Sequence, residues 1–202
     1  MSKSSTRNRN VKEVHMYGLA QRLRLPRGGT FIPSADIEGW NSRKTTLVIN
    51  DMQYHFMISD AVVEAALEQI RLAQKFGWSV VVVENNGSGS TMHCISELLD
   101  ELSVPYKRVT KYSPDGGMNI IWTCKDNNYP TDVIRFVGAY TDMCVRAGAS
   151  TVATESSRST VVLVDEACEP CLKSLNPDWY ANYPNVFIIK KKAAGEESGG
   201  DE

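Results

Sequence analysis

Residues 133–145 read VIRFVGAYTDMCV, and this stretch is the most informative in the chain. Its first five residues are mostly β-branched or bulky and apolar, which is typical of a buried strand. Gly138 ends this run, Thr141 and Asp142 are typical helix-capping residues, and Cys144 follows at the start of a predicted helix. Unpaired N–H groups and the positive end of the dipole in the first turn of a helix favour a thiolate over a thiol. Cys144 is therefore the candidate nucleophile.

The chain alternates strand-like and helix-like segments from about residue 45 onward. Apolar, β-branched runs predict strands over residues 45–50, 78–84, 106–110, 131–139, 159–165 and 185–191. Apolar residues at helical spacing predict helices over residues 60–76 (capped by Gly77), 91–102, 118–125 and from Cys144 onward. Four consecutive valines at residues 80–83 indicate a strand that is buried on both faces. The sequence therefore predicts an α/β fold with helices on both sides of a parallel sheet.

Length and charge limit the class of protein. The 202 residues suit one domain with a substantial core, which we place at 41–193, between a partly ordered N-terminal arm (1–40) and a disordered acidic tail (194–202). The net charge of -2 gives no overall attraction to nucleic acid or anionic membranes. The N-terminal arm carries an excess of basic residues, and it is either a solvated segment or one that binds nucleic acid or a partner. No apolar run reaches membrane-spanning length and the polar start does not resemble a secretory signal, so we expect a cytoplasmic protein.

The five cysteines are scattered, unlike those of a disulfide-rich secreted domain, and this favours a reducing compartment. Cys168 and Cys171 form a C-x-x-C pair. No second pair or nearby histidine completes a zinc site, and the pair follows a strand instead of opening a helix. We interpret this pair as a coincidence.

Three reactive residues stand at the carboxyl ends of predicted strands: Asp51, Lys111 and Cys144. Sites in open α/β sheets form at these ends, and Asp51 would face Cys144 if their strands are neighbours. Taken singly, the aspartate suits a turn, the lysine a surface and the cysteine a core position. Taken together, they suit nucleophilic catalysis, in which a thiolate attacks an acyl or imidoyl carbon, a carboxylate moves the proton and an ammonium stabilises charge.

Four motifs give the chain a family resemblance: LVINDMQ (47–53), VTKYS (109–113), GAYTDMCV (138–145) and VVLVDEA (161–167). In order and approximate spacing they resemble the isochorismatase-like cysteine hydrolases, over roughly residues 44–192. The resemblance implies a Rossmann-like three-layer fold with a six-stranded parallel sheet of order 3-2-1-4-5-6. It implies a catalytic triad of Asp51, Lys111 and Cys144. It also implies a cis peptide bond at Ala139–Tyr140, with the N–H groups of Tyr140 and Cys144 forming an oxyanion hole.

Departures from the family pattern narrow the expected chemistry. Nicotinamidases of this family bind a metal through an aspartate and histidines in the loop after the second strand. The matching loop here, residues 84–91, has no histidine, so we expect no metal and no cofactor. True isochorismatases lack the cysteine, so the presence of Cys144 favours hydrolysis of an amide or related C–N bond. Candidate contacts to a small-molecule substrate are Gln53, Tyr54, Tyr112 and Tyr140. Relatives are often dimers or tetramers, which implies a homo-oligomer.

The leading hypothesis is therefore a small cysteine hydrolase that cleaves a C–N bond through a thioester at Cys144. The alternative is a catalytically silent binding or regulatory protein on the same fold. A third interpretation, a dinucleotide-dependent oxidoreductase, depends only on the glycines of Gly87-Ser88-Gly89, and the third glycine of the phosphate-binding motif is replaced by Met92.

Overall fold

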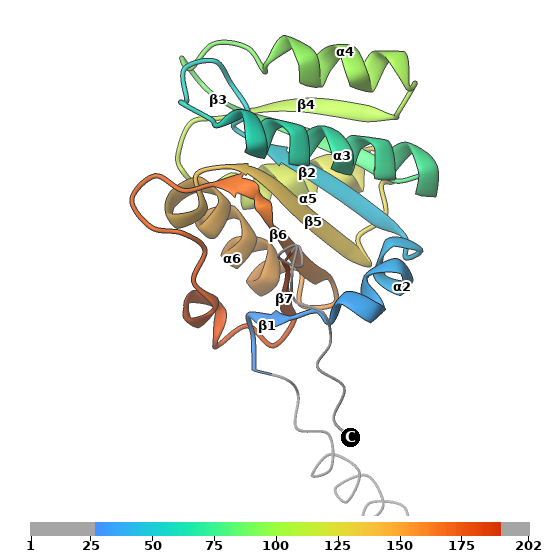
Figure 1. Cartoon of the computed structure of the whole chain (residues 1–202), viewed down its shortest axis with the longest axis vertical. Coiled ribbons are helices and arrows are strands. Elements are labelled where there is room, and N and C mark those ends of the chain that lie inside the picture. Colours follow the sequence, from blue (N-terminus) through green and yellow to red (C-terminus); the bar gives the residue numbers. More distant parts are fainter. Residues whose placement is uncertain (1–26, 191–202) are drawn as a thin grey trace, which may run out of the picture.

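The computed structural model describes residues 27–190 as a three-layer α/β fold (Figure 1). The strands are β1 (Thr30–Phe31), β2 (Thr45–Asn50), β3 (Ser79–Asn85), β4 (Tyr106–Lys111), β5 (Val133–Ala139), β6 (Thr160–Glu169) and β7 (Val186–Ile189). The helices are η1 (Ser34–Asp36), α2 (Ile37–Asn41), α3 (Asp60–Phe76), α4 (His93–Glu101), α5 (Gly117–Asp126), η2 (Thr141–Val145), α6 (Arg146–Glu155) and η3 (Pro177–Tyr180).

All strands pair in parallel, in the order β1-β7-β6-β5-β2-β3-β4. The prediction of an α/β parallel sheet is confirmed, and the prediction of six strands is wrong. The additional strand is Thr30–Phe31, which extends the sheet beside β7. Its two residues are too few to show a period in the sequence. Within the seven-stranded order, the six expected strands keep their relative positions, so β2 and β5 are neighbours at the centre.

Helix α3 shows how local sequence defines an element. Its apolar residues recur on one face, and Val63, Ala66 and Ile70 are buried against the sheet. Gly77 ends the helix in the left-handed conformation (φ 67°), which a residue without a Cβ adopts readily. The helix therefore ends where the sequence predicts, and β3 begins two residues later.

Two apolar cores lie on opposite faces of the sheet. One contains residues of α3 and α4, and the other contains residues of α5, η2 and α6 (Figure 1). Strand β2 supplies side chains to both, since Leu47 and Ile49 face α3 while Val48 faces α6. Burial on both faces explains why the strand sequences are continuously apolar.

The carboxyl ends of β2 and β5 approach closely. Asn50 pairs with Gly138, and a Cβ at Gly138 would lie 1.9 Å from the Asn50 carbonyl oxygen. Gly138 also has a φ of 126°, in the region that favours glycine. Only glycine therefore fits at this position, immediately before the segment that carries Cys144.

The terminal predictions fall largely outside the described residues. The tail at 194–202 lies wholly outside them, and so do residues 1–26 of the N-terminal arm. Residues 27–40 are described, and they form β1, η1 and most of α2. The domain boundaries stay predictions. Within residues 27–190, no helix has the length and apolar character that crossing a membrane requires.

Candidate active site

The three predicted catalytic side chains meet at one edge of the sheet. Asp51 follows β2, Lys111 is the last residue of β4, and Cys144 lies in η2 after β5. Asp51 and Lys111 form an ion pair, and the Asp51 carboxyl interacts with the Cys144 thiol. All three are buried, with exposed fractions of 0%, 1% and 8%. The spatial convergence predicted from strand order is therefore observed, while the catalytic roles of these residues stay a proposal.

Lys111 is held by acceptors on every side. Its Nζ donates to Asp51 Oδ2 at 2.9 Å and to the carbonyl oxygens of Ser113 and Pro114, each at 3.1 Å. These three bonds use all the donors of an ammonium group. Gly116 leaves room for the lysine stem, because a Cβ there would lie 2.9 Å from Lys111 Cδ. With these three partners, the buried ammonium group of Lys111 is fixed in place and cannot turn toward solvent.

Asp51 occupies an unusual backbone position. Its φ is 55°, and its N–H donates to the carbonyl oxygen of Val83 at 2.8 Å. Burial raises the pKa of the Asp51 carboxyl, and the hydrogen bond and charge of Lys111 oppose that rise, as do Cys144 and Asn50. The carboxyl thus holds a proton more readily than an exposed aspartate does, which suits a group that must accept and return one.

The state of Cys144 differs from the sequence expectation of a thiolate. Burial raises the pKa of its thiol to about 11, and the negative charge and hydrogen bond of Asp51 contribute to the rise, while Lys111 opposes it. Cys144 lies in a single π-helical turn, and α6 begins only at Arg146. Burial, together with the nearby Asp51 carboxylate, outweighs the helix terminus here, so the sulfur is a thiol with a base beside it.

The peptide bond between Ala139 and Tyr140 is cis, as the resemblance predicts. The carbonyl oxygen of Ala139 accepts a hydrogen bond of 2.9 Å from Asn50 Nδ2. The carbonyl oxygen of Tyr140 accepts from the N–H groups of Met143 and Val145. The oxyanion hole assigned to the N–H groups of Tyr140 and Cys144 stays a prediction.

The loop after β3 is held by the buried side chain of Gln53 and the partly buried side chain of Glu84. Gln53 accepts from the Asn85 N–H at 2.7 Å and donates from Nε2 to the carbonyl oxygens of Asn85 and Gly89. Glu84 accepts from the N–H (2.9 Å) and hydroxyl (2.6 Å) of Thr91. These bonds explain why the loop is polar. Residues 84–91 contain no histidine, and their one carboxylate, Glu84, is engaged by Thr91.

The four predicted substrate contacts differ in how exposed their side chains are. Gln53 is fully buried and has the protein partners described above, whereas Tyr54 and Tyr112 are 64% and 82% exposed. The Tyr54 hydroxyl accepts from the His93 N–H at 2.9 Å. The Tyr140 ring packs edge-on against Phe56, with centroids 5.5 Å apart. A role in substrate binding stays a prediction for all four residues.

Two carboxylates hold the turns around the site together. The sequence predicts Asp142 only as a helix cap, a bond that the structure does not show at η2 or α6, and it gives Asp115 no role. Asp142 accepts from the N–H groups of Cys171 and Leu172 at 3.1 Å each, which anchors the loop after β6 to the turn that contains Cys144. Asp115 accepts from the Gly117 N–H at 2.8 Å and from the hydroxyl of Thr151, in α6, at 2.7 Å. Thr151 therefore explains part of the polarity of α6. Of these four bonds, the one from the Gly117 N–H to Asp115 is local, and an aspartate followed by glycine is a sequence signal for it. The other three join residues far apart in the sequence and have no local signal.

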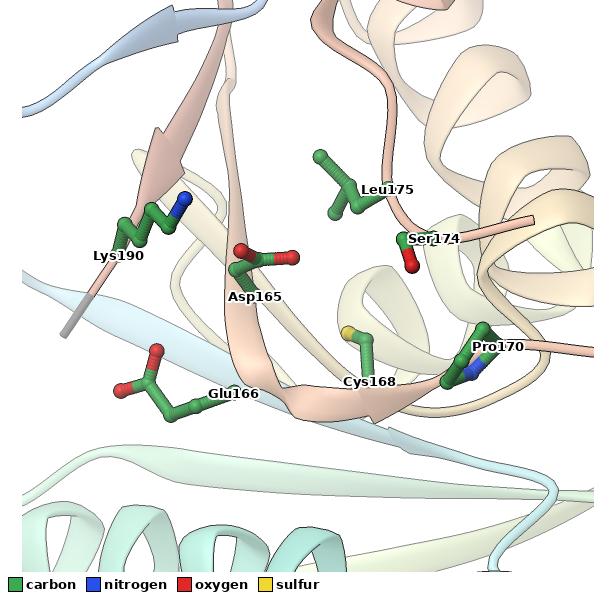
Figure 2. A pocket seen from close by; sticks show the side chains of 7 residues that line it. All are labelled: Asp165, Glu166, Cys168, Pro170, Ser174, Leu175 and Lys190. Carbon is green, nitrogen blue, oxygen red and sulfur yellow. The ribbon is translucent and has the colours of Figure 1, made fainter. Parts of the chain in front are cut away.

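A separate cavity of about 430 Å³ lies at the carboxyl ends of β6 and β7 (Figure 2). Lys190 and Asp165 both line this cavity, and in Figure 2 the Lys190 amino group points toward the Asp165 carboxyl. Its lining excludes the three candidate catalytic residues and consists of Asp165, Glu166, Cys168, Pro170, Ser174, Leu175 and Lys190. Cys168 is buried and Cys171 is exposed, both as free thiols. Among residues 27–190, no cluster of three or more His, Cys, Asp or Glu side chains is arranged to hold a metal ion.

Comparison with solved structures gives the same fold as the sequence resemblance. The N-carbamoylsarcosine amidase of Thermoplasma acidophilum matches with a TM-score of 0.56, at 17% identity over 78% of this chain and 100% of that one. The nicotinamidase of Staphylococcus aureus matches with a TM-score of 0.54, at 12% identity over 67% and 88%. An isochorismatase of Pseudomonas putida matches with a TM-score of 0.53, at 14% identity over 87% and 95%. No protein-family model and no curated protein matches the sequence. At these identities the likeness establishes the fold alone.

Proposed function

We propose that this chain is an isochorismatase-like cysteine hydrolase that cleaves the C–N bond of a small amide through a thioester on Cys144. The observation that supports this most directly is the buried Lys111–Asp51 pair, 2.9 Å between Nζ and Oδ2, with the Asp51 carboxyl also interacting with the Cys144 thiol. The solved structures that share this fold include an amidase and a nicotinamidase.

In the first half of the reaction, Asp51 takes the proton of the Cys144 thiol as the sulfur attacks the carbonyl carbon. An S–C bond forms, and the carbonyl oxygen becomes an oxyanion near the N–H groups of Tyr140 and Cys144. When the intermediate collapses, the C–N bond breaks, and the amine leaves with the proton that Asp51 carried. The product of this half is a thioester and a free amine.

In the second half, Asp51 removes a proton from water, and the resulting hydroxide attacks the thioester carbon. The C–S bond breaks, the acid is released, and the sulfur regains a proton from Asp51. Lys111 keeps its charge beside Asp51 throughout, so it stabilises the carboxylate each time the proton leaves. Each proton that Asp51 accepts is returned, so the cycle consumes only amide and water.

The rival function is a binding protein with an inactive site. The buried ion pair argues against it, because a lysine and an aspartate out of contact with water need a compensating role. A further part of the proposal is that the chain acts in the cytoplasm and forms a dimer or tetramer. Light scattering on the purified protein would measure the oligomeric state.

Ammonia release from a panel of small amides tests the proposal. The panel includes nicotinamide and N-carbamoylsarcosine, each offered to the wild type and to Cys144→Ala. Cys94→Ala is the matched control, because Cys94 is an exposed thiol on α4. We expect turnover by the wild type and the control and none by Cys144→Ala. Substantial turnover by Cys144→Ala would rule out the thioester.

A further inference from the structure

We propose that Asn50 is a positioning residue that gives the two oxygens of Asp51 different tasks. It holds Oδ2 in place, so that Oδ1 is left to exchange the proton with Cys144. This inference depends on the proposed function, in which Asp51 is the proton carrier.

The hydrogen bonds at the carboxylate are unevenly distributed. Asn50 Nδ2 donates to Asp51 Oδ2 at 3.2 Å, and Lys111 Nζ donates to the same oxygen at 2.9 Å. In the described part of the chain, no group donates to the buried Oδ1 within hydrogen-bond geometry. The Cys144 thiol is the remaining polar group that acts on this carboxyl. The oxygen without a donor is therefore the one available for the sulfur proton.

The same amide also contacts the segment that leads to the nucleophile. Asn50 Nδ2 donates to the carbonyl oxygen of Ala139 at 2.9 Å, and this carbonyl belongs to the peptide bond that enters Tyr140. Asn50 is fully buried, and its own Oδ1 has no donor among the described residues. Both hydrogen bonds of the Asn50 amide come from its nitrogen, while its buried oxygen has no donor. The amide is therefore oriented to donate. Asn50 thus links the base to the end of β5, which leads into the turn that contains Cys144.

Donation to Oδ2 favours the ionised form of Asp51. The titratable groups that act on this carboxyl are Lys111 from β4 and Cys144 from η2, and replacing Asn50 changes neither of these residues. Loss of the Asn50 donor therefore raises the pKa of Asp51, by about one pH unit for a hydrogen bond to a charged group. It also removes one of the two donors that hold Oδ2, so the orientation of the carboxylate is less fixed.

The test is a titration of the Asp51 carboxyl carbon by ¹³C NMR in protein labelled at aspartate, with Asp51→Asn identifying the signal. The test variant is Asn50→Leu, which fills similar volume without a donor. The control is Thr46→Val, since Thr46 is buried in the same strand and donates to the Pro130 carbonyl oxygen at 2.6 Å, away from the site. If Asn50→Leu does not fold, Asn50→Ser replaces it, because a serine hydroxyl is too short to make both bonds.

We expect the Asp51 midpoint to rise by about one pH unit in Asn50→Leu and to stay unchanged in Thr46→Val. The acid limb of Cys144-dependent turnover should move with it. A folded Asn50→Leu with an unshifted Asp51 midpoint would overturn the inference. Failure of the proposed function has a different signature, namely a wild type that releases no ammonia in a Cys144-dependent way, and the titration does not depend on that result.

Discussion

Replacing Asp51 with asparagine should make the Cys144 thiol more acidic while abolishing amide hydrolysis. The thiol pKa is raised from 9.0 to about 11, first by burial and then by the charge and hydrogen bond of Asp51. Asparagine keeps the shape of the side chain and removes its charge, while Lys111 stays to favour the thiolate. Because burial is the larger cause and persists, only part of the rise is lost, which we take as about one pH unit.

The size of the effect on alkylation follows from this shift. Below its pKa, a thiol that is about one unit more acidic has about ten times more thiolate. Each thiolate is about threefold less nucleophilic, so the net rate of alkylation rises about threefold. Amide turnover should fall by about 10²–10⁴, since no group is left to carry the proton to the leaving amine. Faster alkylation together with slower amide turnover distinguishes the loss of the Asp51 charge from simple damage to the site.

The assay is the rate of iodoacetamide labelling of the tryptic peptide 136–146, which contains Cys144 as its single cysteine. Rates measured from neutral to alkaline pH give the apparent thiol pKa. Asp165→Asn is the control, because Asp165 is a half-buried carboxyl in the separate cavity. Slower labelling in Asp51→Asn at every pH would refute the reasoning, since the carboxylate would then not be what holds the proton on the sulfur.

Three further predictions concern the scaffold of the site. Gly138→Ala should destabilise the fold by more than about 2 kcal/mol in urea unfolding, because the added Cβ meets the Asn50 carbonyl at 1.9 Å; an unchanged midpoint would contradict the close approach of β2 and β5. Lys111→Met should lower stability by about 3–5 kcal/mol in the same assay, as it leaves the Asp51 charge buried without its partner; a neutral effect would mean that Asp51 is not ionised. Partial burial would raise the pKa of Asp142, but hydrogen bonds from backbone N–H groups lower it below its ordinary value. That contribution to stability is present above the ordinary aspartate pKa and is lost as pH falls through the lowered one. On acidification, the melting temperature of Asp142→Asn should therefore fall less than that of the wild type. An equal fall in both proteins would contradict the anchoring role.

Much of the fold could be predicted because periodicity and burial agree along the chain. Helix α3 was predicted to its residue limits, since its apolar face and the glycine after it are both local signals. Strand β1 could not be predicted in this way. Thr30–Phe31 is exposed and two residues long, and it is a strand only because β7 offers a free edge. Pairing with a distant edge leaves no trace in a segment this short.

The candidate site was predictable where chemistry depends on residue type at a strand end, as for Asp51, Lys111 and Cys144. The protonation state of Cys144 could not be predicted in this way. The thiol pKa of Cys144 depends on how deeply the sulfur is buried and how near the carboxylate lies, and both are properties of the folded chain. The role of Asn50 was hidden for the same reason, because an asparagine beside an aspartate becomes informative only when its amide is seen to reach Ala139.

The most direct test of the account is mass spectrometry of peptide 136–146 from enzyme quenched during turnover of an amide that the wild type hydrolyses. If Cys144 is the nucleophile, an acyl adduct appears on its sulfur, disappears as the substrate is exhausted, and is absent when Cys144 is alanine. Turnover with an unmodified peptide at every time, undiminished in the alanine variant, would contradict it.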